Sequence, residues 1–454
     1  MKIKSIKIIG AGLAGSEAAW QCARRGVAVE LYEMRPGKST PAHRTDKFAE
    51  LVCSNSLKSE SENTAPWLLK EEMRRAGSLL IEIARETAVP AGHALAVDRE
   101  AFASKVTERL GSEPNIRIVR QEVTAVDEDA GLTVIASGPL TSDSLSQEIV
   151  RLSSSDHLYF YDSISPIVEA DSIDRARVYF AARYGKGTAD YINCPFTKDD
   201  YERFVDGLIA AQSVEGHDWE KLNYFEACLP IEEIARRGRD TLRFGPMKPV
   251  GLADPRTGKQ PYAVVQLRRE NLRADSYNLV GFQNHLKYAE QARVLRLIPG
   301  LENARFLRYG QIHRNTYINA PALLNETLNM KRHPNVFFAG QISGVEGYTE
   351  SIATGMLAGL HVARIAQGLV ATAPPRETAL GSLVDYICRA EAKSFQPANI
   401  TFDLLPQLDD RTLRRTRDKK LRHKTVCEKA LDALASWQEA ISICPETHAS
   451  TVTR

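Results

Sequence analysis

The clearest pattern of hydrophobic and polar positions lies at the beginning of the chain. Residues 4–9 form a short apolar run rich in β-branched side chains, residues 16–25 form a helix-like run, and residues 27–32 form a second apolar run. Apolar runs of this length are typical of buried strands. A strand, a helix and a second strand in this order predict a βαβ unit in a parallel sheet.

The turn between the first strand and the helix carries a glycine pattern. It reads Gly10-Ala11-Gly12-Leu13-Ala14-Gly15, and the second strand is followed by Glu33. In dinucleotide-binding folds, such glycines make the tight turn, let the backbone approach a pyrophosphate and let the helix pack on the strand. Free N–H groups at the helix N-terminus bind phosphate, and the acid accepts hydrogen bonds from ribose hydroxyls. The predicted cofactor-binding residues of this unit are Gly10, Gly12, Leu13, Ala14, Gly15 and Glu33.

The acid at position 33 also bears on the choice of cofactor. A carboxylate there favours FAD or NAD over NADP, because it would repel the extra phosphate of NADP. The simpler alternative is a glycine-rich turn in an ordinary βαβ unit. The complete sequence of strand, glycines, helix, strand and acid favours nucleotide binding.

A related unit recurs late in the chain. Residues 334–339 form an apolar strand that ends in Gly340, and Gly344 and Tyr348 precede a predicted helix at residues 350–367. The N-terminus of such a helix can point at the pyrophosphate and flavin of FAD, which selects FAD over NAD for the first site. Taken alone, the segment could be one more parallel strand with its crossover helix, and Tyr348 could be either a neighbour of the flavin ring or a core residue.

The region between these units divides into two parts. The first part predicts helices at residues 66–86 and 100–110, strands at 116–119 and 132–136, and a glycine at a strand end, Gly138, that lets the backbone approach a dinucleotide.

From about residue 159 the βαβ rhythm stops, and aromatic and charged segments alternate around a predicted helix at residues 198–212. The predicted fold class is α/β, an FAD-binding Rossmann-like domain with an inserted α+β domain. The predicted boundaries are 1–171 for the first part of the FAD-binding domain, 172–304 for the inserted domain, and 305–454 for the second part with a basic, helical C-terminal tail.

Composition and charge exclude few classes of protein. The chain has 454 residues, enough for two or three domains, and its 59 Lys and Arg residues against 57 Asp and Glu residues give a net charge of +2. This balance indicates no particular partner. Because the sequence has no long apolar run and no signal peptide at its N-terminus, we expect a cytoplasmic protein that does not enter a membrane.

The seven cysteines are widely spaced and form no C-x-x-C pair; they are Cys22, Cys53, Cys194, Cys228, Cys388, Cys427 and Cys444. This spacing argues against a disulfide framework, a structural zinc site and a dithiol redox motif, and no metal is expected. Cys22, inside the first helix, is predicted to be a packed apolar residue. Cys53 follows the nucleotide unit in a polar loop, where it could be a thiolate beside the cofactor or a solvent-facing thiol without a role.

Eight cations lie within fourteen residues of the C-terminal region, between Arg411 and Lys424. Such a run is often only a solvated helix face, but on a nearly neutral protein it also suits contacts with the phosphates of a nucleic acid. The residues proposed for these contacts are Arg414, Arg415, Arg417, Lys419 and Lys420.

Several longer segments carry a family resemblance, namely residues 9–19, 51–56, 191–195, 225–230, 245–249 and 339–348. With these segments the chain resembles, nearly end to end, the folate- and FAD-dependent tRNA (uracil-5-)-methyltransferases of the TrmFO family. The segments around Cys228 and at residues 344–348 are more specific than the glycine pattern, which many flavoproteins share. The chain departs from the family pattern at Ala398 and Asp403, where Met and Gly are expected, and this concerns the packing of the tail rather than the chemistry.

The resemblance implies a reaction with three parts. One carbon comes from 5,10-methylenetetrahydrofolate, electrons come from NADPH or NADH through FAD, and a uridine in the T-loop of tRNA is the acceptor. Uracil C5 becomes nucleophilic only after a thiolate adds to C6, and the C5 proton must then leave to a base. By the family pattern, Cys228 is the nucleophile, Cys53 near the flavin is the base, and Cys194 is structural.

Three further residues are weaker candidates. His285 is a candidate to stack on the folate pteridine against the flavin, although a lone histidine is more often a packed or surface residue. Arg99 and Lys248 are candidates to hold anionic groups of folate or RNA.

Other functions explain part of the same sequence. A member of the family could methylate a uridine in ribosomal RNA by the same chemistry. An NAD(P)H–FAD oxidoreductase acting on small molecules would explain the glycine patterns, but not Cys228 or the basic tail. A non-catalytic, flavin-binding RNA chaperone would explain the tail and the FAD site, and would not need Cys228. The FAD enzymes that build carboxymethylaminomethyl groups on wobble uridine share the first glycine pattern and lack the context of Cys228.

Overall fold

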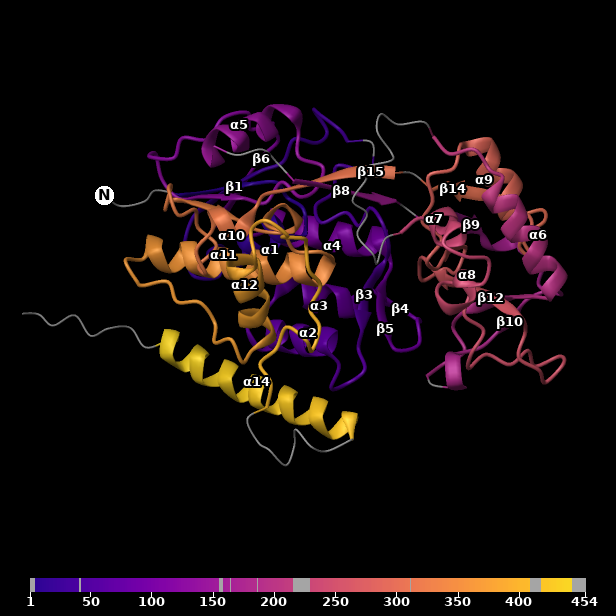
Figure 1. Ribbon diagram of the computed structural model, residues 1–454. Helices are drawn as coiled ribbons and strands as arrows, with labels where there is room; N and C mark the ends of the chain where they lie inside the picture. The colour runs from indigo at the N-terminus through magenta and orange to yellow at the C-terminus, as the bar shows by residue number, and fades with distance from the viewer. Residues whose placement is uncertain are drawn as a thin grey trace, which may run out of the picture.

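A computed structural model describes residues 5–40, 42–154, 158–163, 165–185, 187–214, 229–310, 312–408 and 418–442, with the backbone alone at 158–163 and 312–314. These residues form two lobes, each built around its own sheet (Figure 1). Each sheet has its own core of buried apolar side chains. None of the helices in the described part of the chain is long and apolar enough to cross a membrane.

The first lobe contains the parallel sheet that the sequence predicts. Each strand pairs in parallel with its neighbour, and the βαβ unit places Ile8 opposite Leu31. Both faces of the central strand are buried, as its apolar, β-branched sequence requires. In spatial order the strands are β16 (Val336–Phe338), β7 (Thr133–Ile135), β1 (Ile6–Ile9), β2 (Val29–Tyr32) and β6 (Ile116–Val119).

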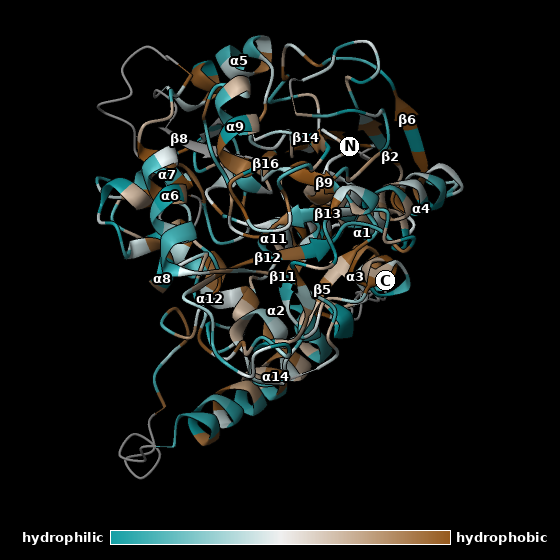
Figure 2. Cartoon of the chain, turned by 90° about the vertical axis from the view of Figure 1, so that its right-hand side faces the viewer, coloured by the Kyte–Doolittle hydropathy of each residue, from teal (hydrophilic) through white to brown (hydrophobic). Residues whose placement is uncertain are grey.

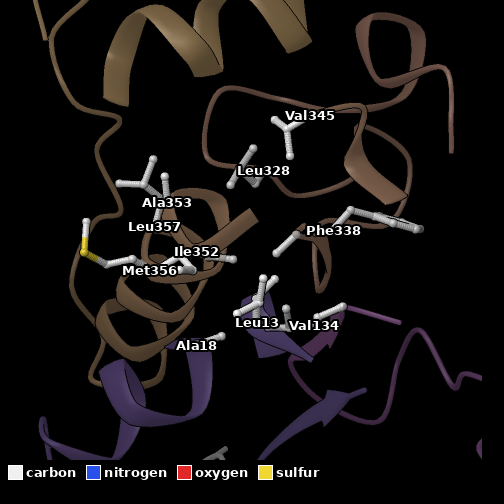
Figure 3. Packing of buried hydrophobic residues seen from close by; sticks show 14 of the residues in the cluster. Leu13, Ala18, Val134, Leu328, Phe338, Val345, Ile352, Ala353, Met356 and Leu357 are labelled. Carbon is white, nitrogen blue, oxygen red and sulfur yellow. The ribbon is translucent and has the colours of Figure 1, made fainter. Parts of the chain in front are cut away.

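Two helices that are far apart in the sequence pack closely against each other, α1 (Leu13–Ala23) and α11 (Tyr348–Ala366). A Cβ atom at Gly355 would lie 2.3 Å from the backbone oxygen of Ala14, and one at Gly359 would lie 2.5 Å from that of Ala18. Only glycine allows this approach. Figure 3 shows side chains of both helices gathered with side chains of β7 and β16 in one cluster.

The other elements of the first lobe surround this core. The predicted helix at residues 66–86 is wrong as a single element, because Gly77 adopts φ +76° and Ser78 caps a new helix by accepting from the N–H of Ile81. The helices are α2 (Ala65–Arg75), α3 (Leu79–Glu86), α4 (Arg99–Gly111), α5 (Asp143–Ser153), α10 (Ala320–Leu323), α12 (Ala379–Arg389) and α14 (Lys419–Ser442), with a 3₁₀ turn at Gln341–Ser343. A small antiparallel sheet contains β3 (Ser56–Ser59), β5 (Ala94–Val97) and β4 (Ala88–Val89).

The second lobe contains an antiparallel sheet, whose strands in spatial order are β10 (Tyr179–Phe180), β11 (Ile192–Phe196), β12 (Ala263–Arg269), β13 (Ser276–Leu279), β9 (Ile167–Glu169) and β14 (Phe306–Arg308). Its helices are α6 (Lys198–Ile209), α7 (Ile231–Arg236), α8 (Thr241–Phe244) and α9 (Tyr288–Leu295), with 3₁₀ turns at Ala170–Ser172 and Arg183–Gly185. Buried residues of α6 recur at helical spacing, at positions 201, 204, 205 and 208. Figure 2 views the molecule from this lobe and shows hydrophilic residues along α6.

A two-stranded antiparallel sheet of β8 (Leu158–Ser163) and β15 (Ile312–Tyr317) lies between the two lobes along the chain and in Figure 1. The sheet of the second lobe includes strands on both sides of the range 172–304, at β9 and β14. The predicted domain boundaries themselves stay a prediction. The α/β class is confirmed, because a parallel βαβ sheet and a separate antiparallel sheet with helices are both present.

The C-terminal helix α14 lies against the first lobe at α2. Cys427, Ala430, Leu434 and Trp437 form its buried stripe, and the described cations at its start, Lys419 and Lys420, are exposed. Arg414, Arg415 and Arg417 lie outside the described residues. The proposed phosphate contacts of this tail therefore stay a prediction.

A buried carboxyl group links α2 to α12. Glu72 has no exposed surface and accepts hydrogen bonds from the backbone N–H groups of Ala379 and Leu380, at 2.7 and 2.8 Å. These donors belong to the first turn of α12, which has no helical partners for them. Burial raises the pKa of Glu72 to about 8, against the partial compensation of these hydrogen bonds.

This pKa predicts a pH-dependent stability. A glutamate in the unfolded chain titrates near about 4.3, so the contribution of Glu72 is complete below that pH and is lost as the pH rises through about 8. Between pH 5 and pH 8, we expect the wild-type protein to lose about 3 kcal/mol of unfolding free energy through this group. Urea titrations at several pH values should show that the Glu72→Gln protein does not lose this unfolding free energy between pH 5 and pH 8. The exposed Glu82→Gln control should lose it as the wild type does; equal pH slopes for all three proteins would contradict the assignment.

Candidate active site

A cavity opens at the carboxyl ends of the parallel strands, where ligands bind in open α/β sheets. It holds about 1020 Å³ of atom-free space, including solvent at its mouth. Its walls come from the turn after β1, the ends of β2, β6 and β7, the segment after β16, and the start of α11. Among the predicted site residues, those that line it are Gly10, Gly12, Leu13, Ala14, Glu33, Gly340 and Tyr348.

The glycine turn has the geometry that its sequence predicts. Gly10 adopts φ +97°, and a Cβ there would lie 2.6 Å from the carbonyl oxygen of Ala136. A Cβ at Gly15 would lie 1.8 Å from the oxygen of Gly10, so Gly15 serves helix packing and does not line the cavity. At Gly12, in contrast, a Cβ would meet no atom within 4 Å, because this position faces open space.

Two helix N-termini contribute to the cavity wall. The N-caps of α1 and α11 are Gly12 and Gly347, and neither helix has a side-chain cap. Leu13 and Ala14 of α1 and Tyr348 and Ser351 of α11 line the cavity. N-terminal N–H groups without a side-chain cap, together with the helix dipoles, suit an anionic group such as a pyrophosphate.

The acid after β2 is held by an adjacent arginine. Arg35 binds Glu33 with Nε to Oε1 at 2.9 Å and Nη2 to Oε2 at 3.2 Å, and the N–H of Ala11 donates to Oε2 at 3.2 Å. Burial alone would raise the pKa of Glu33, but the hydrogen bonds and charge of Arg35 outweigh it and hold the pKa below its usual range. Glu33 is therefore an ionised acceptor at the cavity wall.

Cys53 lies next to the cavity, in a loop held from two sides. The backbone N–H groups of Cys53 and Ser54 donate to the phenol oxygen of Tyr348, at 2.8 and 3.0 Å. Arg99 donates to the carbonyl oxygens of Leu51 and Cys53, at 2.8 and 3.1 Å. Burial raises the pKa of the Tyr348 phenol above its usual range, so this hydroxyl stays neutral and accepts both N–H groups.

The second lobe also holds this loop. Glu270, at the end of β12, forms an ion pair with Arg99 at 2.5 Å, and both side chains are mostly buried. Arg268 donates to Asn55 Oδ1 at 2.9 Å and to Ser54 Oγ at 2.7 Å. The charge of Arg99 is thus already paired within the chain, where it holds the loop of Cys53. Its role in holding anionic groups of folate or RNA stays a prediction.

Two predicted residues, His285 and Gly344, lie away from the cavity, and a third is not described. Cys228 is outside the described residues. His285 lies in the second lobe beside α7, with Nδ1 3.1 Å from Glu232 Oε1, and burial lowers its pKa. Gly344 packs against Phe395, whose ring a Cβ would approach to 2.4 Å. Neither His285 nor Gly344 lines the cavity, and the roles of all three stay predictions. The candidate Lys248 is exposed in the second lobe.

The remaining cysteines in the described residues are buried; they are Cys22, Cys194, Cys388 and Cys427. Burial raises the pKa of the Cys22 thiol to about 12 and that of Cys194 well above its usual range. Both are therefore packed thiols, as predicted for Cys22.

Part of the cavity wall is not predicted by the sequence. Residues 121–123 after β6, 139–142 after β7, and His43 line it as well. Their common signal is position, since most of them directly follow a predicted strand of the parallel sheet. Arg35 is not among the predicted residues either, although a cation two residues after this acid is a natural partner for it.

Similar proteins were found in three comparisons. The family model for Glucose inhibited division protein A matches residues 5–369. A curated relative from Koribacter versatilis, methylenetetrahydrofolate–tRNA-(uracil-5-)-methyltransferase TrmFO, is 76% identical over 432 residues, which are 95% of this chain and 97% of the relative. The protein of the same name from Solibacter usitatus is 64% identical over 443 residues, with 96% and 99% covered.

Among solved structures, Aquifex aeolicus GidA in its form II crystal aligns with a TM-score of 0.70. It is 17% identical to this chain, and the alignment covers 98% of this chain and 74% of GidA. The sheet, the glycine turn and the cavity thus define a Rossmann-like protein with the GidA fold, of the FAD-binding type that the sequence predicts. Within this class, the chain belongs to the TrmFO family, and the predicted family is confirmed.

The Arg99–Glu270 pair yields a prediction. Arg99→Met leaves the carboxylate of Glu270 buried without its cation, which we expect to lower the unfolding free energy by about 3–5 kcal/mol. The matched control is Arg117→Met, because its guanidinium is exposed, so loss of its ion pair with Glu30 should lower the unfolding free energy far less. Urea unfolding measures both; an equal loss for the two variants would contradict the structural role of Arg99.

Proposed function

We propose that this protein methylates C5 of a uridine in the T-loop of tRNA, with one carbon from 5,10-methylenetetrahydrofolate and reducing equivalents from NADPH or NADH. The observation that carries the proposal is the position of Cys53. Its loop is attached to Tyr348, which lines a cavity suited to a dinucleotide, in a chain that belongs to the TrmFO family. The predicted cytoplasmic location is part of the same proposal.

FAD is the proposed occupant of the cavity. The two helix N-termini without side-chain caps would face its pyrophosphate, the open position at Gly12 would admit it, and Glu33 would share its carboxylate between Arg35 and a ribose hydroxyl. When bound, FAD would supply hydride transfer from NADPH or NADH to the one-carbon unit. The atom-free space of about 1020 Å³, part of which is solvent at the mouth, is of the size that cofactor sites have.

The proposed chemistry assigns one role to each cysteine. The thiolate of Cys228 adds to uracil C6, and the resulting enolate forms a bond from C5 to the methylene carbon of the folate. Cys53, as a thiolate, takes the C5 proton, and loss of the folate nitrogen leaves an exocyclic methylene. Hydride addition converts this methylene to methyl, and expulsion of the Cys228 thiolate restores the C5–C6 double bond. Overall, one NAD(P)H and one proton are consumed, and tetrahydrofolate is released.

The proposed RNA contacts lie at the C-terminal region, at Arg414, Arg415, Arg417, Lys419 and Lys420. The exposure of Lys419 and Lys420 supports this assignment, since phosphate contacts require accessible cations. Binding through them would weaken steeply with salt.

The FAD site can be tested without turnover. Gly12→Val places its side chain in open space at ordinary backbone angles, so we expect at least about tenfold less bound flavin in the purified protein and the melting temperature of the flavin-stripped wild type. Gly111→Val, at the end of α4, is the matched control and should keep its flavin. A Gly12→Val protein with full flavin absorbance would refute the proposed cofactor position.

The roles of the two cysteines can be separated with tRNA that contains 5-fluorouridine. Fluorine at C5 cannot leave as a proton, so the Cys228–C6 bond should persist as a denaturant-resistant protein–RNA band. We expect this band with the wild-type protein and with Cys53→Ala, and none with Cys228→Ala. On ordinary tRNA, both variants should form less than about 1% of the wild-type product, a loss within the range for a missing nucleophile or base.

Cys388→Ser is the control, because Cys388 is buried in the first lobe and donates to the carbonyl of Asn325. It should form both the band and the product. Retained methylation by Cys228→Ala would refute the proposed mechanism. A flavin spectrum with no band for any protein would instead favour an oxidoreductase of small molecules.

A further inference from the structure

A polar groove lies between the two lobes. One wall comes from residues 58–59 and 91–94 of the first lobe, and the other comes from residues 182–183, Tyr191 and Gln266 of the second lobe. The groove holds about 700 Å³ of atom-free space, including solvent at its mouth. In the described part of the chain it shares no lining residue with the cavity at the ends of the parallel strands. The elements of its walls, β3 with β5 and β12, lie on the facing sides of the two lobes (Figure 1).

The groove adjoins the loop that carries Cys53. Gln266 and Arg268 are two residues apart on β12, so their side chains share one face of the strand and lie about 7 Å apart along it. Gln266 lines the groove, whereas Arg268 donates to Ser54 Oγ of the loop at 2.7 Å. On the opposite wall, Lys58 belongs to β3, the strand that continues this loop. A ligand in the groove would therefore lie beside the proposed base.

The second-lobe wall contains a positive charge that no carboxylate in the described part of the chain pairs. The half-buried Arg183 donates to the carbonyl oxygens of Val250 and Lys248 and to Gln266 Oε1, the last two at 3.0 Å. All three acceptors are neutral. They use three of the five N–H donors of the guanidinium and leave two. Because a guanidinium that loses water is normally paired with an anion, Arg183 suits an anionic ligand.

The other charged groups at the groove are already engaged. Lys58 forms an ion pair at 2.7 Å with Glu350, whose side chain has no exposed surface. The carboxylate of Asp190 accepts from the N–H of Gly92 at 3.0 Å and from the hydroxyl of Thr188. These contacts leave the groove with a net positive character that comes from Arg183.

An exposed aromatic ring stands next to this arginine. Tyr184 is 58% exposed, and its ring lies so close to Gly251 that a Cβ there would approach it to 2.7 Å. The backbone of Tyr184 has φ +60°, which is unfavourable for a residue other than glycine, and its N–H donates to the oxygen of Gly251 at 2.6 Å. The segment thus holds a large ring at the surface beside an arginine. Proteins bind single-stranded RNA with this combination, in which bases stack on rings and phosphates contact cations.

We propose that the groove binds single-stranded nucleotides of the tRNA next to the target uridine, with a phosphate at Arg183 and a base against Tyr184. This inference rests on the proposed function, in which a uridine must reach Cys53. It adds a second RNA contact, separate from the cations of the C-terminal region. Lys248 lies at the same place, since its carbonyl accepts from Arg183, and its exposed ammonium group is available for a neighbouring phosphate.

The first test is protection of Arg183 from phenylglyoxal in the flavin-loaded wild-type protein. Peptide mass spectrometry follows Arg183 and, as the control, Arg203 on α6, which is exposed on the second lobe. At a tRNA concentration of about ten times its Kd, we expect the modification rate of Arg183 to fall about tenfold, because only the unoccupied protein reacts. The rate at Arg203 should stay the same.

The second test measures tRNA binding by variants at several salt concentrations. Arg183→Gln should bind more weakly and reduce the slope of log K against log salt by about 0.7, the value for one phosphate contact of a single strand. Tyr184→Ala should bind at least about fivefold more weakly with an unchanged slope, because stacking releases no counterions. Tyr184→Phe, which keeps the ring, and Arg203→Gln should both bind as the wild type does. Melting temperature and flavin content show whether each variant is folded.

Unchanged modification of Arg183 in a wild-type protein that binds tRNA would overturn the proposal, and this result does not depend on the folding of any variant. Protection by tetrahydrofolate alone would also overturn it, because the anion would then be a carboxylate of folate. Since protection requires no turnover, it is independent of the 5-fluorouridine experiment. Protection without an RNA adduct would sustain the groove while the proposed methylation fails, and an adduct without protection would do the opposite. A wild-type protein that binds no tRNA would refute both.

Discussion

The close contact between α1 and α11 is the constraint on which the site depends. The backbones of the two helices approach at Gly355 and Gly359, where any larger residue would collide with Ala14 or Ala18. This contact joins segments separated by more than 300 residues and brings two helix N-termini to one cavity. It also fixes Tyr348 at the start of α11, and the phenol of Tyr348 in turn holds the backbone of Cys53. The position of Cys53, the proposed base, thus follows from the packing of two helices that contain neither of the two proposed catalytic cysteines.

Polar contacts join the two lobes at this loop. Each lobe has its own apolar core, whereas the loop of Cys53 meets the second lobe through Arg268 and through the pair of Arg99 with Glu270. Polar contacts of this kind require specific geometry, because a buried charge without its partner is strongly unfavourable. They therefore specify where the loop lies more strictly than an apolar contact would.

The sequence was sufficient for those parts of the site that depend on local backbone geometry. The turn at Gly10, the helix packing at Gly15 and the late strand before Gly340 follow from glycine sterics and strand length, which are properties of short segments. The break at Gly77 was missed because the apolar spacing continues across it and only the backbone conformation reveals it. Likewise, Arg99 appeared as a free cation until the fold placed Glu270 against it.

The shared attachment of the Cys53 loop has a thermodynamic consequence. One end of the attachment, Tyr348, belongs to the wall of the cavity, and the other end, Arg268 with Glu270, belongs to the second lobe. A ligand that stabilises one arrangement of the loop must therefore stabilise the matching arrangement of the lobe contact, and the coupling acts equally in both directions. Occupancy of the cavity and the contact between the lobes are linked equilibria, because the loop at residues 51–56 takes part in both.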